Sequence, residues 1–289
     1  MNHSRILALR LWVCLGFTLL TPGQHAVAGD AWLTDYGNAM QKARKQQQMM
    51  LIYFHPTEKT TFEMSVLGHE SLAPLLNKVT CVKQAVDTQV TIGGQATTLL
   101  KHESFREMHR KPGLAMLDFT DPKTEHYGRV VSVLPFSRRK PDVEQVRELL
   151  QLPGGSLTQR TLMLAVRIHP EHPQSTAGAA DPALLSASQE HSLYQARIRQ
   201  QGHHNWNSRF HRINARLGAN LVAQEVCAES WSGQTLWDAA IECVQSWRQS
   251  PGHWEAVRTR HVKCGDDMKG GGTGVWYATG VFARPLGTN

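Results

Sequence analysis

The sequence lacks several short motifs that identify common enzymes and binding sites. It contains no Cys-x-x-Cys pair, no His-Glu-x-x-His metal motif and no P-loop, and its basic residues match no recognised nucleic-acid-binding module. No serine, cysteine or threonine stands in a pattern typical of an activated nucleophile. These absences argue against thiol–disulfide exchange, zincin-type proteolysis, nucleotide hydrolysis and nucleic-acid binding.

Long apolar runs are also scarce. The one notable run, Leu11 to Leu20, follows the basic residues Arg5 and Arg10 and precedes the small-residue stretch Ala26-Val27-Ala28. It is shorter than the roughly 20 residues that a membrane-spanning helix needs, so a cleaved signal is favoured over an uncleaved anchor. We therefore predict a signal peptide at residues 1–28 and an exported chain, periplasmic or secreted, with no further transmembrane segment.

Cysteine is rare, and four cysteines follow the predicted signal peptide: Cys81, Cys227, Cys243 and Cys264. An even number in an oxidising compartment allows two disulfides, with three pairings open. Free buried thiols are an equal alternative, because Cys81 and Cys243 both lie in apolar patterns.

Between residues 29 and 152 the pattern alternates between helix and strand. Apolar runs predict strands at 49–54, 79–86, 114–119 and 128–134, and helical spacing predicts helices within 32–43, 62–76, 99–108 and 141–150. Short strands alternating with helices imply crossover connections and a mixed sheet, so the predicted class is α/β.

This order of elements resembles the thioredoxin fold. The resemblance includes Pro112 before the third core strand, where thioredoxins keep a cis-proline loop. The segment after Phe54, where the family has its Cys-x-x-Cys, begins His55-Pro56-Thr57-Glu58 and contains no cysteine. The resemblance thus implies a redox-inactive thioredoxin-like domain at residues 29–152, with His55 and Glu58 in a solvated loop.

The short flexible segment Pro153-Gly154-Gly155-Ser156 predicts a boundary, with a second domain at residues 153–289. In that domain we expect a strand from Thr161 to Ile168, a surface turn at 169–173, and a hairpin turn at 270–272 before a terminal strand. Helical spacing predicts three helices, within 184–198, 206–217 and 235–247, and places His191 on an apolar face as a hydrogen-bonded core residue.

Polar residues gather near three tryptophans of this second half. They are His203 and His204, Glu225 and Glu229, and His253, which we expect on the turn that leaves the last helix at Ser250-Pro251-Gly252. Imidazole nitrogens and carboxylate oxygens suit zinc or another borderline divalent ion. The cluster therefore predicts a ligand site, although the spacing alone matches no established metal motif.

The same stretch resembles the CAP superfamily of cysteine-rich secretory, antigen 5 and pathogenesis-related proteins, and its bacterial secreted branch in particular. The likeness rests on the His/Asn segment near Trp206, the Glu225 segment, Trp247-x-x-Ser250-Pro251-Gly252-His253 and the terminal Gly274-Val275-Trp276-Tyr277 run. It implies an α/β/α sandwich with a cleft formed by His204, or less favourably His203, with Glu225 and His253. The family's second glutamate would fall on Glu242 or Glu229.

The resemblance implies binding of a ligand or divalent metal, with His204 and His253 as the metal ligands, rather than catalysis. One alternative is a metal-assisted hydrolase in which Glu225 acts as general base. Another is a non-catalytic interaction module. The net charge of +7 is dispersed, and for an exported chain it favours an anionic wall polymer or a lipid headgroup over nucleic acid as partner.

Overall fold

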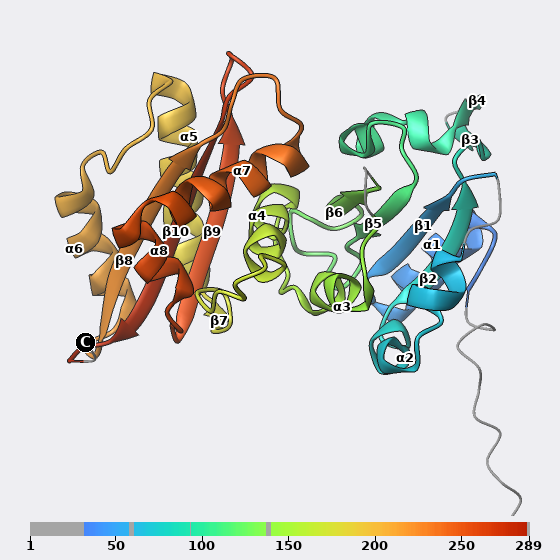
Figure 1. Ribbon diagram of the computed structural model, residues 1–289. Coiled ribbons are helices and arrows are strands. Elements are labelled where there is room, and N and C mark those ends of the chain that lie inside the picture. The colour runs from blue at the N-terminus through green and yellow to red at the C-terminus, as the bar shows by residue number, and fades with distance from the viewer. Residues whose placement is uncertain (1–31, 58–60, 93, 137–139, 288–289) are drawn as a thin grey trace, which may run out of the picture.

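The computed structural model describes residues 32–57, 61–92, 94–136 and 140–287, so the predicted signal peptide lies outside the described residues. These residues form two four-stranded sheets, each with helices packed against it, and a small two-stranded hairpin (Figure 1). Both four-stranded sheets are mixed. This arrangement confirms the predicted α/β class.

The first sheet has the strand order β2-β1-β5-β6. Strand β1 pairs in parallel with β2 and antiparallel with β5, which pairs antiparallel with β6. The strands are β1 (Met50–His55), β2 (Thr80–Ala85), β5 (Gly113–Leu117) and β6 (Val130–Pro135). All four coincide with predicted strands to within a few residues.

Side chains alternate between the two faces of β1 and pack into two separate cores. Leu51 and Tyr53 face a core that includes α3 (Val143–Gln151), whereas Ile52 and Phe54 face a core that includes α1 (Tyr36–Gln46).

Two predicted helices of this half are broken into shorter pieces. Between 62 and 76 the structure has η1 (Glu63–Leu67), η2 (Glu70–Leu72) and α2 (Ala73–Leu76). The predicted third helix is a pair of 3-10 turns, η3 (Leu99–Lys101) and η4 (Glu103–Met108).

The hairpin of β3 (Gln89–Ile92) and β4 (Gln95–Thr98) was not predicted from the sequence. The peptide bond before Pro112 is trans, because the described residues contain no cis bond, whereas the thioredoxin resemblance implied a cis one. The thioredoxin-like assignment itself stays a prediction.

The second sheet has the order β7-β9-β10-β8. Its strands are β7 (Ala179–Ala180), β8 (Leu221–Glu229), β9 (Lys263–Gly270) and β10 (Trp276–Pro285). Strands β9 and β10 form an antiparallel hairpin, as the glycine-rich turn predicted. Among the described strands β8 pairs with β10 alone, so its other edge is available to side chains from neighbouring helices.

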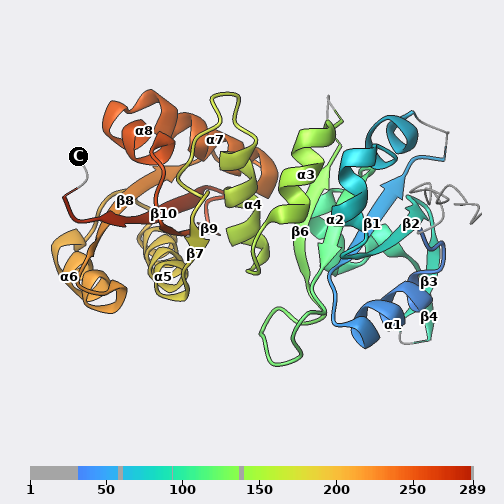
Figure 2. The ribbon, with the colours of Figure 1, turned by 90° about the horizontal axis from the view of Figure 1, so that it is seen from below.

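Helices cover both faces of this sheet (Figure 2). One layer consists of α5 (Pro182–Ile198) and α6 (Trp206–Leu217), and the other contains α7 (Leu236–Gln249) and α8 (Pro251–Arg258). Helix α5 lies very close to β9, since a Cβ added at Gly265 would fall 2.3 Å from the carbonyl carbon of Leu184. The result is a helix–sheet–helix sandwich.

The segment predicted as the strand Thr161–Ile168 is instead helix α4 (Leu157–Arg167). Ser156 begins this helix with a capping box, because its side chain accepts from the Gln159 amide while the Gln159 side chain accepts from the Ser156 amide. Met163 and Leu164 pack into the first core, and Leu162, Ala165 and Val166 pack into the core of the second sheet. Helix α4 therefore forms the wall shared by the two halves, and the predicted boundary at 152/153 stays a prediction.

The buried side chain of Arg160 fastens α4 to the first sheet. Its guanidinium donates to the Ser132 hydroxyl at 2.7 Å and to the Leu152 carbonyl at 3.0 Å.

Within the described part of the chain, no helix combines the length and the apolar character that crossing a membrane requires.

Candidate metal centre

Three elements meet at the free edge of β8 to form the candidate site. Strand β8 contributes Glu225, the segment before α6 contributes His203, and α8 contributes His253. His253 lies in the first turn of α8 rather than on an irregular turn, because Ser250-Pro251-Gly252 ends α7 and also begins the next helix. Proline suits this role, since a first-turn residue needs no amide donor.

His203 connects the other two residues. Its Nδ1 donates to Glu225 Oε1 at 3.0 Å, and its Nε2 accepts a hydrogen bond from His253 Nε2 at 3.1 Å. The Nδ1–H bond leaves Nε2 of a neutral His203 with a lone pair that faces His253. His203 is exposed and His253 is half-buried, so solvent and solutes can reach the two nitrogens.

Arg209 of α6 holds Glu225 from the other side. Its guanidinium contacts both carboxylate oxygens, with NH1 donating to Oε1 at 3.1 Å and NH2 to Oε2. The Glu225 side chain is 1% exposed and that of Arg209 is 10% exposed, so this is a buried ion pair. Burial alone would raise the pKa of Glu225, but the hydrogen bonds from His203 and Arg209 outweigh it and leave that pKa below its usual range. Glu225 is thus a fixed carboxylate anion.

Burial lowers the pKa of His253, and the neighbouring His203 lowers it further. The imidazole of His253 is therefore kept neutral more readily than a free histidine. A neutral imidazole is the form that binds metal ions.

Helix α8 is anchored on its far side by Glu171. The Trp254 indole donates to Glu171 Oε2 at 3.0 Å, and Arg248 of α7 binds the other carboxylate oxygen. The Arg248 guanidinium also lies over the Trp254 ring, 5.4 Å from its centroid. The predicted surface turn at 169–173 therefore fixes the position of the residue next to His253.

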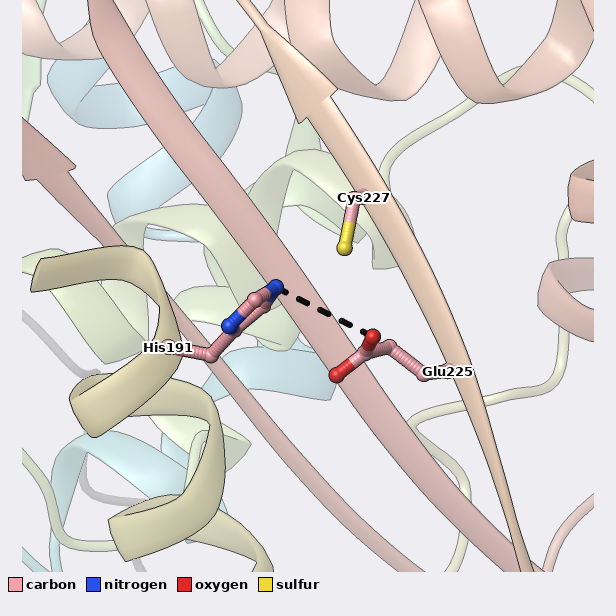
Figure 3. Close-up of side chains that lie close together, drawn as sticks. All are labelled: His191, Glu225 and Cys227. Carbon is pink, nitrogen blue, oxygen red and sulfur yellow. Dashed lines mark ion pairs between the residues drawn. The ribbon is translucent and has the colours of Figure 1, made fainter. Parts of the chain in front are cut away.

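A second group of metal-ligand types lies deeper, where His191 of α5 faces Glu225 and Cys227 of β8 (Figure 3). Their donor atoms lie within 4.8 Å of one another, and all three residues are buried. His191 Nε2 donates to the Gly202 carbonyl at 2.8 Å, as expected for a hydrogen-bonded core histidine, and lies 3.9 Å from Glu225 Oε1.

This deeper group fits a cation poorly. Burial raises the pKa of Cys227 well above its usual value, and the Glu225 carboxylate adds to that effect. The guanidinium of Arg209 already neutralises Glu225, and the His191 nitrogen nearest to the carboxylate carries a proton. The Nε2 atoms of His203 and His253 are the better pair of metal ligands, because they lie at an accessible position and transfer of the His253 proton from Nε2 to Nδ1 frees both lone pairs.

The structure places the sequence-predicted residues unequally. Glu225 and His253 come together as expected, but their partner is His203 rather than the favoured His204, whose Nε2 donates to the Gln200 carbonyl at 3.3 Å. Glu229 is exposed at the end of β8, four residues from Glu225 and so about 13 Å further along the strand. Among the described residues, only Glu225 contributes a carboxylate bonded to either imidazole.

Arg209 was not predicted as a site residue, although the sequence carries a signal for it. Arg209 follows Trp206 by three residues and precedes Ile213 by four, which places its guanidinium on the apolar face of α6. A charged residue on a buried face needs a partner of opposite charge. That rule pointed to a buried carboxylate such as Glu225.

The four cysteines of the described residues are all free and buried. The structure thus agrees with the alternative of free thiols rather than with disulfides. Burial raises the pKa of the Cys243 thiol, and it also raises the pKa of Cys264, to about 12.

Comparisons with known proteins leave the chain without an assigned family. No family model matches it, and no curated protein matches it. Among solved structures, an outer surface protein from Borrelia burgdorferi is similar at a TM-score of 0.31, with 19% sequence identity over 37% of this chain and 77% of that chain. A likeness of this extent carries no argument about function, so the resemblance to the CAP superfamily stays a prediction.

Proposed function

We propose that this protein binds a divalent metal ion, with zinc as the best match, through Nε2 of His203 and Nε2 of His253. The observation that carries the proposal is the approach of these two nitrogens to 3.1 Å at an accessible position. Two imidazole nitrogens on one tetrahedral zinc lie about 3.3 Å apart, because Zn–N bonds measure about 2.0–2.1 Å. The pair is therefore close to the spacing that a shared ion requires.

The contacts behind His203 support the same function. Metal-binding histidines commonly donate their second ring N–H to a carboxylate, which fixes the tautomer and makes the other nitrogen a better donor. Here Glu225 receives that bond, and Arg209 fixes Glu225 in turn. Glu225 is then a positioning residue, and the pair of histidines supplies two of the four ligands that zinc prefers, with solvent or a ligand completing the set.

These contacts favour binding over hydrolysis. A general base must accept a proton and reach the reacting water, yet Glu225 is buried, holds three hydrogen bonds and has a lowered pKa. The proposal includes export of the protein, so that the metal site would act outside the cytoplasm. Its ligand there would be an anionic wall polymer or a lipid.

Zinc titration by calorimetry of the protein purified from an export host tests the proposal. We expect one ion per chain, loss of binding in His203→Ala and in His253→Ala, and unchanged binding in His204→Ala, the adjacent histidine that serves as matched control. Glu225→Gln should weaken binding by about 10- to 100-fold, as is typical when the carboxylate behind a ligand is removed. Binding that survives in both His203→Ala and His253→Ala, or no one-to-one binding in the native protein, would overturn the proposal.

A further inference from the structure

A separate cavity of about 380 Å³ lies between α5 and α6, next to the candidate metal centre. Its lining comes from α5, from the segment before α6 and from the first turns of α6. His204, which does not contact His253, lines this cavity instead. The metal-binding proposal leaves this cavity without a role.

Several polar groups of the lining have no protein partner. Among the described residues, the Tyr194 hydroxyl, the Asn205 amide and the Ser208 hydroxyl make no hydrogen bond within the protein, and Asn205 does not cap α6 although it occupies the N-cap position. His204 donates from Nε2 to the Gln200 carbonyl, so its Nδ1 remains an acceptor. The cavity thus offers both donors and acceptors to a ligand.

The charges of the lining are of both signs, and the buried one is already paired. Arg209 binds the buried carboxylate of Glu225, and Arg212 lies 3.8 Å from the Glu190 carboxylate. Burial lowers the pKa of His191, which keeps that imidazole neutral. An anionic ligand would therefore have to compete with the buried Glu225 for Arg209 and would meet the exposed carboxylate of Glu190, whereas an uncharged ligand would not.

Aromatic rings form one wall of the cavity. The rings of Tyr194 and His204 meet edge to face with centroids 5.7 Å apart, and His191 stacks behind Tyr194 at 6.2 Å with 13° between the planes. Tyr194 is 38% exposed, so part of its ring is open to a ligand. A rigid aromatic wall of this kind packs against the C–H face of a sugar ring, while hydroxyl groups of the sugar bond to the polar lining.

We propose that this cavity binds one or two rings of an uncharged oligosaccharide. A sugar hydroxyl both donates and accepts, which matches the unpaired hydroxyl, amide and imidazole groups, and a neutral ring leaves the two arginine–carboxylate pairs intact. The site is distinct from the metal pair, although it shares His191 and Arg209 with the surroundings of Glu225.

Calorimetry of the full protein with three tetrasaccharides tests this proposal: chitotetraose and maltotetraose, which are neutral, and tetragalacturonate, which is anionic. We expect at least one neutral tetrasaccharide to bind, with affinity reduced about tenfold in Tyr194→Ala and about three- to tenfold in Ser208→Ala. Leu193→Ala is the matched control, because Leu193 is 47% exposed on the same helix but does not line the cavity.

Each variant is also titrated with zinc and checked by circular dichroism, so that a sugar-binding loss is separated from misfolding and from loss of the metal site. Unchanged zinc binding together with weakened sugar binding in Tyr194→Ala supports the proposal. No binding of either neutral tetrasaccharide at millimolar concentration, binding of tetragalacturonate alone, or equal affinity in Tyr194→Ala and Leu193→Ala would overturn it, without affecting the metal proposal.

Discussion

Asp266 of β9 should make the protein less stable as the pH rises through neutrality. Its side chain is fully buried, and neither carboxylate oxygen has a hydrogen-bond partner among the described residues. Burial raises the pKa of Asp266 to about 8; the positive charge of Arg167 opposes this rise and the neighbouring Asp267 adds to it. Asp266 is therefore a neutral acid in the folded protein at pH 6.

The sign of the effect follows from proton counting. In the unfolded chain Asp266 ionises near its ordinary value of 3.8, so between that pH and about 8 the folded state holds one more proton than the unfolded state. The free energy of unfolding then falls by about 1.4 kcal/mol for each pH unit, or about 2 kcal/mol from pH 6 to pH 7.5. Above about pH 8 the carboxylate is ionised in both states and this slope disappears.

Urea unfolding of the native protein and of Asp266→Asn, measured at several pH values between 6 and 7.5, checks this expectation. The amide is nearly the same shape but cannot ionise, so the difference in unfolding free energy between the two proteins should change by about 2 kcal/mol over this range. Histidine titrations occur in both proteins and cancel in that difference. Asp87→Asn, at an exposed aspartate, is the control and should show no such change. Parallel stability curves for the native protein and Asp266→Asn would refute the reasoning.

Two further predictions concern the surroundings of Glu225. Arg209→Ala leaves the buried Glu225 carboxylate without its arginine partner and should lower the free energy of unfolding by about 3–5 kcal/mol in urea. The exposed Arg212→Ala is the control and should lower it by less than about 0.5 kcal/mol. Equal effects of the two substitutions would contradict the buried ion pair. Because burial keeps Cys227 protonated, iodoacetamide should alkylate it slowly in the native protein and rapidly in urea, with peptide mass spectrometry as the readout; rapid native alkylation would show that the thiol is accessible.

In the second half of the chain, helices with one polar face could be predicted from their spacing. Helices α5, α6 and α7 show clear helical spacing because each has a solvent face, and the glycine-rich turn marked the β9–β10 hairpin. Helix α4 was not predictable from spacing, because every residue from 159 to 166 is buried between two sheets and the run reads equally well as a buried strand. The capping pair Ser156 and Gln159 was the local signal that favoured a helix.

The site was predictable in composition but not in detail. Glu225 and His253 could be chosen from residue type and neighbours, whereas the choice between His203 and His204 depends on the backbone of the loop, where Asn205 adopts a left-handed conformation with φ of 54°. Adjacent residues in such a loop point in different directions, and only the tertiary structure decides which one meets His253. The strand β8 was also missed, because the charged Glu225 interrupts its apolar pattern on a buried face.

The position of the histidine pair follows from the layering of the second sheet. His203 belongs to the layer of α5 and α6, and His253 belongs to the layer of α7 and α8, so the two imidazoles can meet only beyond the free edge of β8. Arg209 and Glu225 hold the first layer to that strand, while Glu171 and Trp254 hold the second. An ion bound between the two nitrogens would thus connect both layers directly. How well the two histidines can bind a metal therefore depends on the contacts that hold each layer in place.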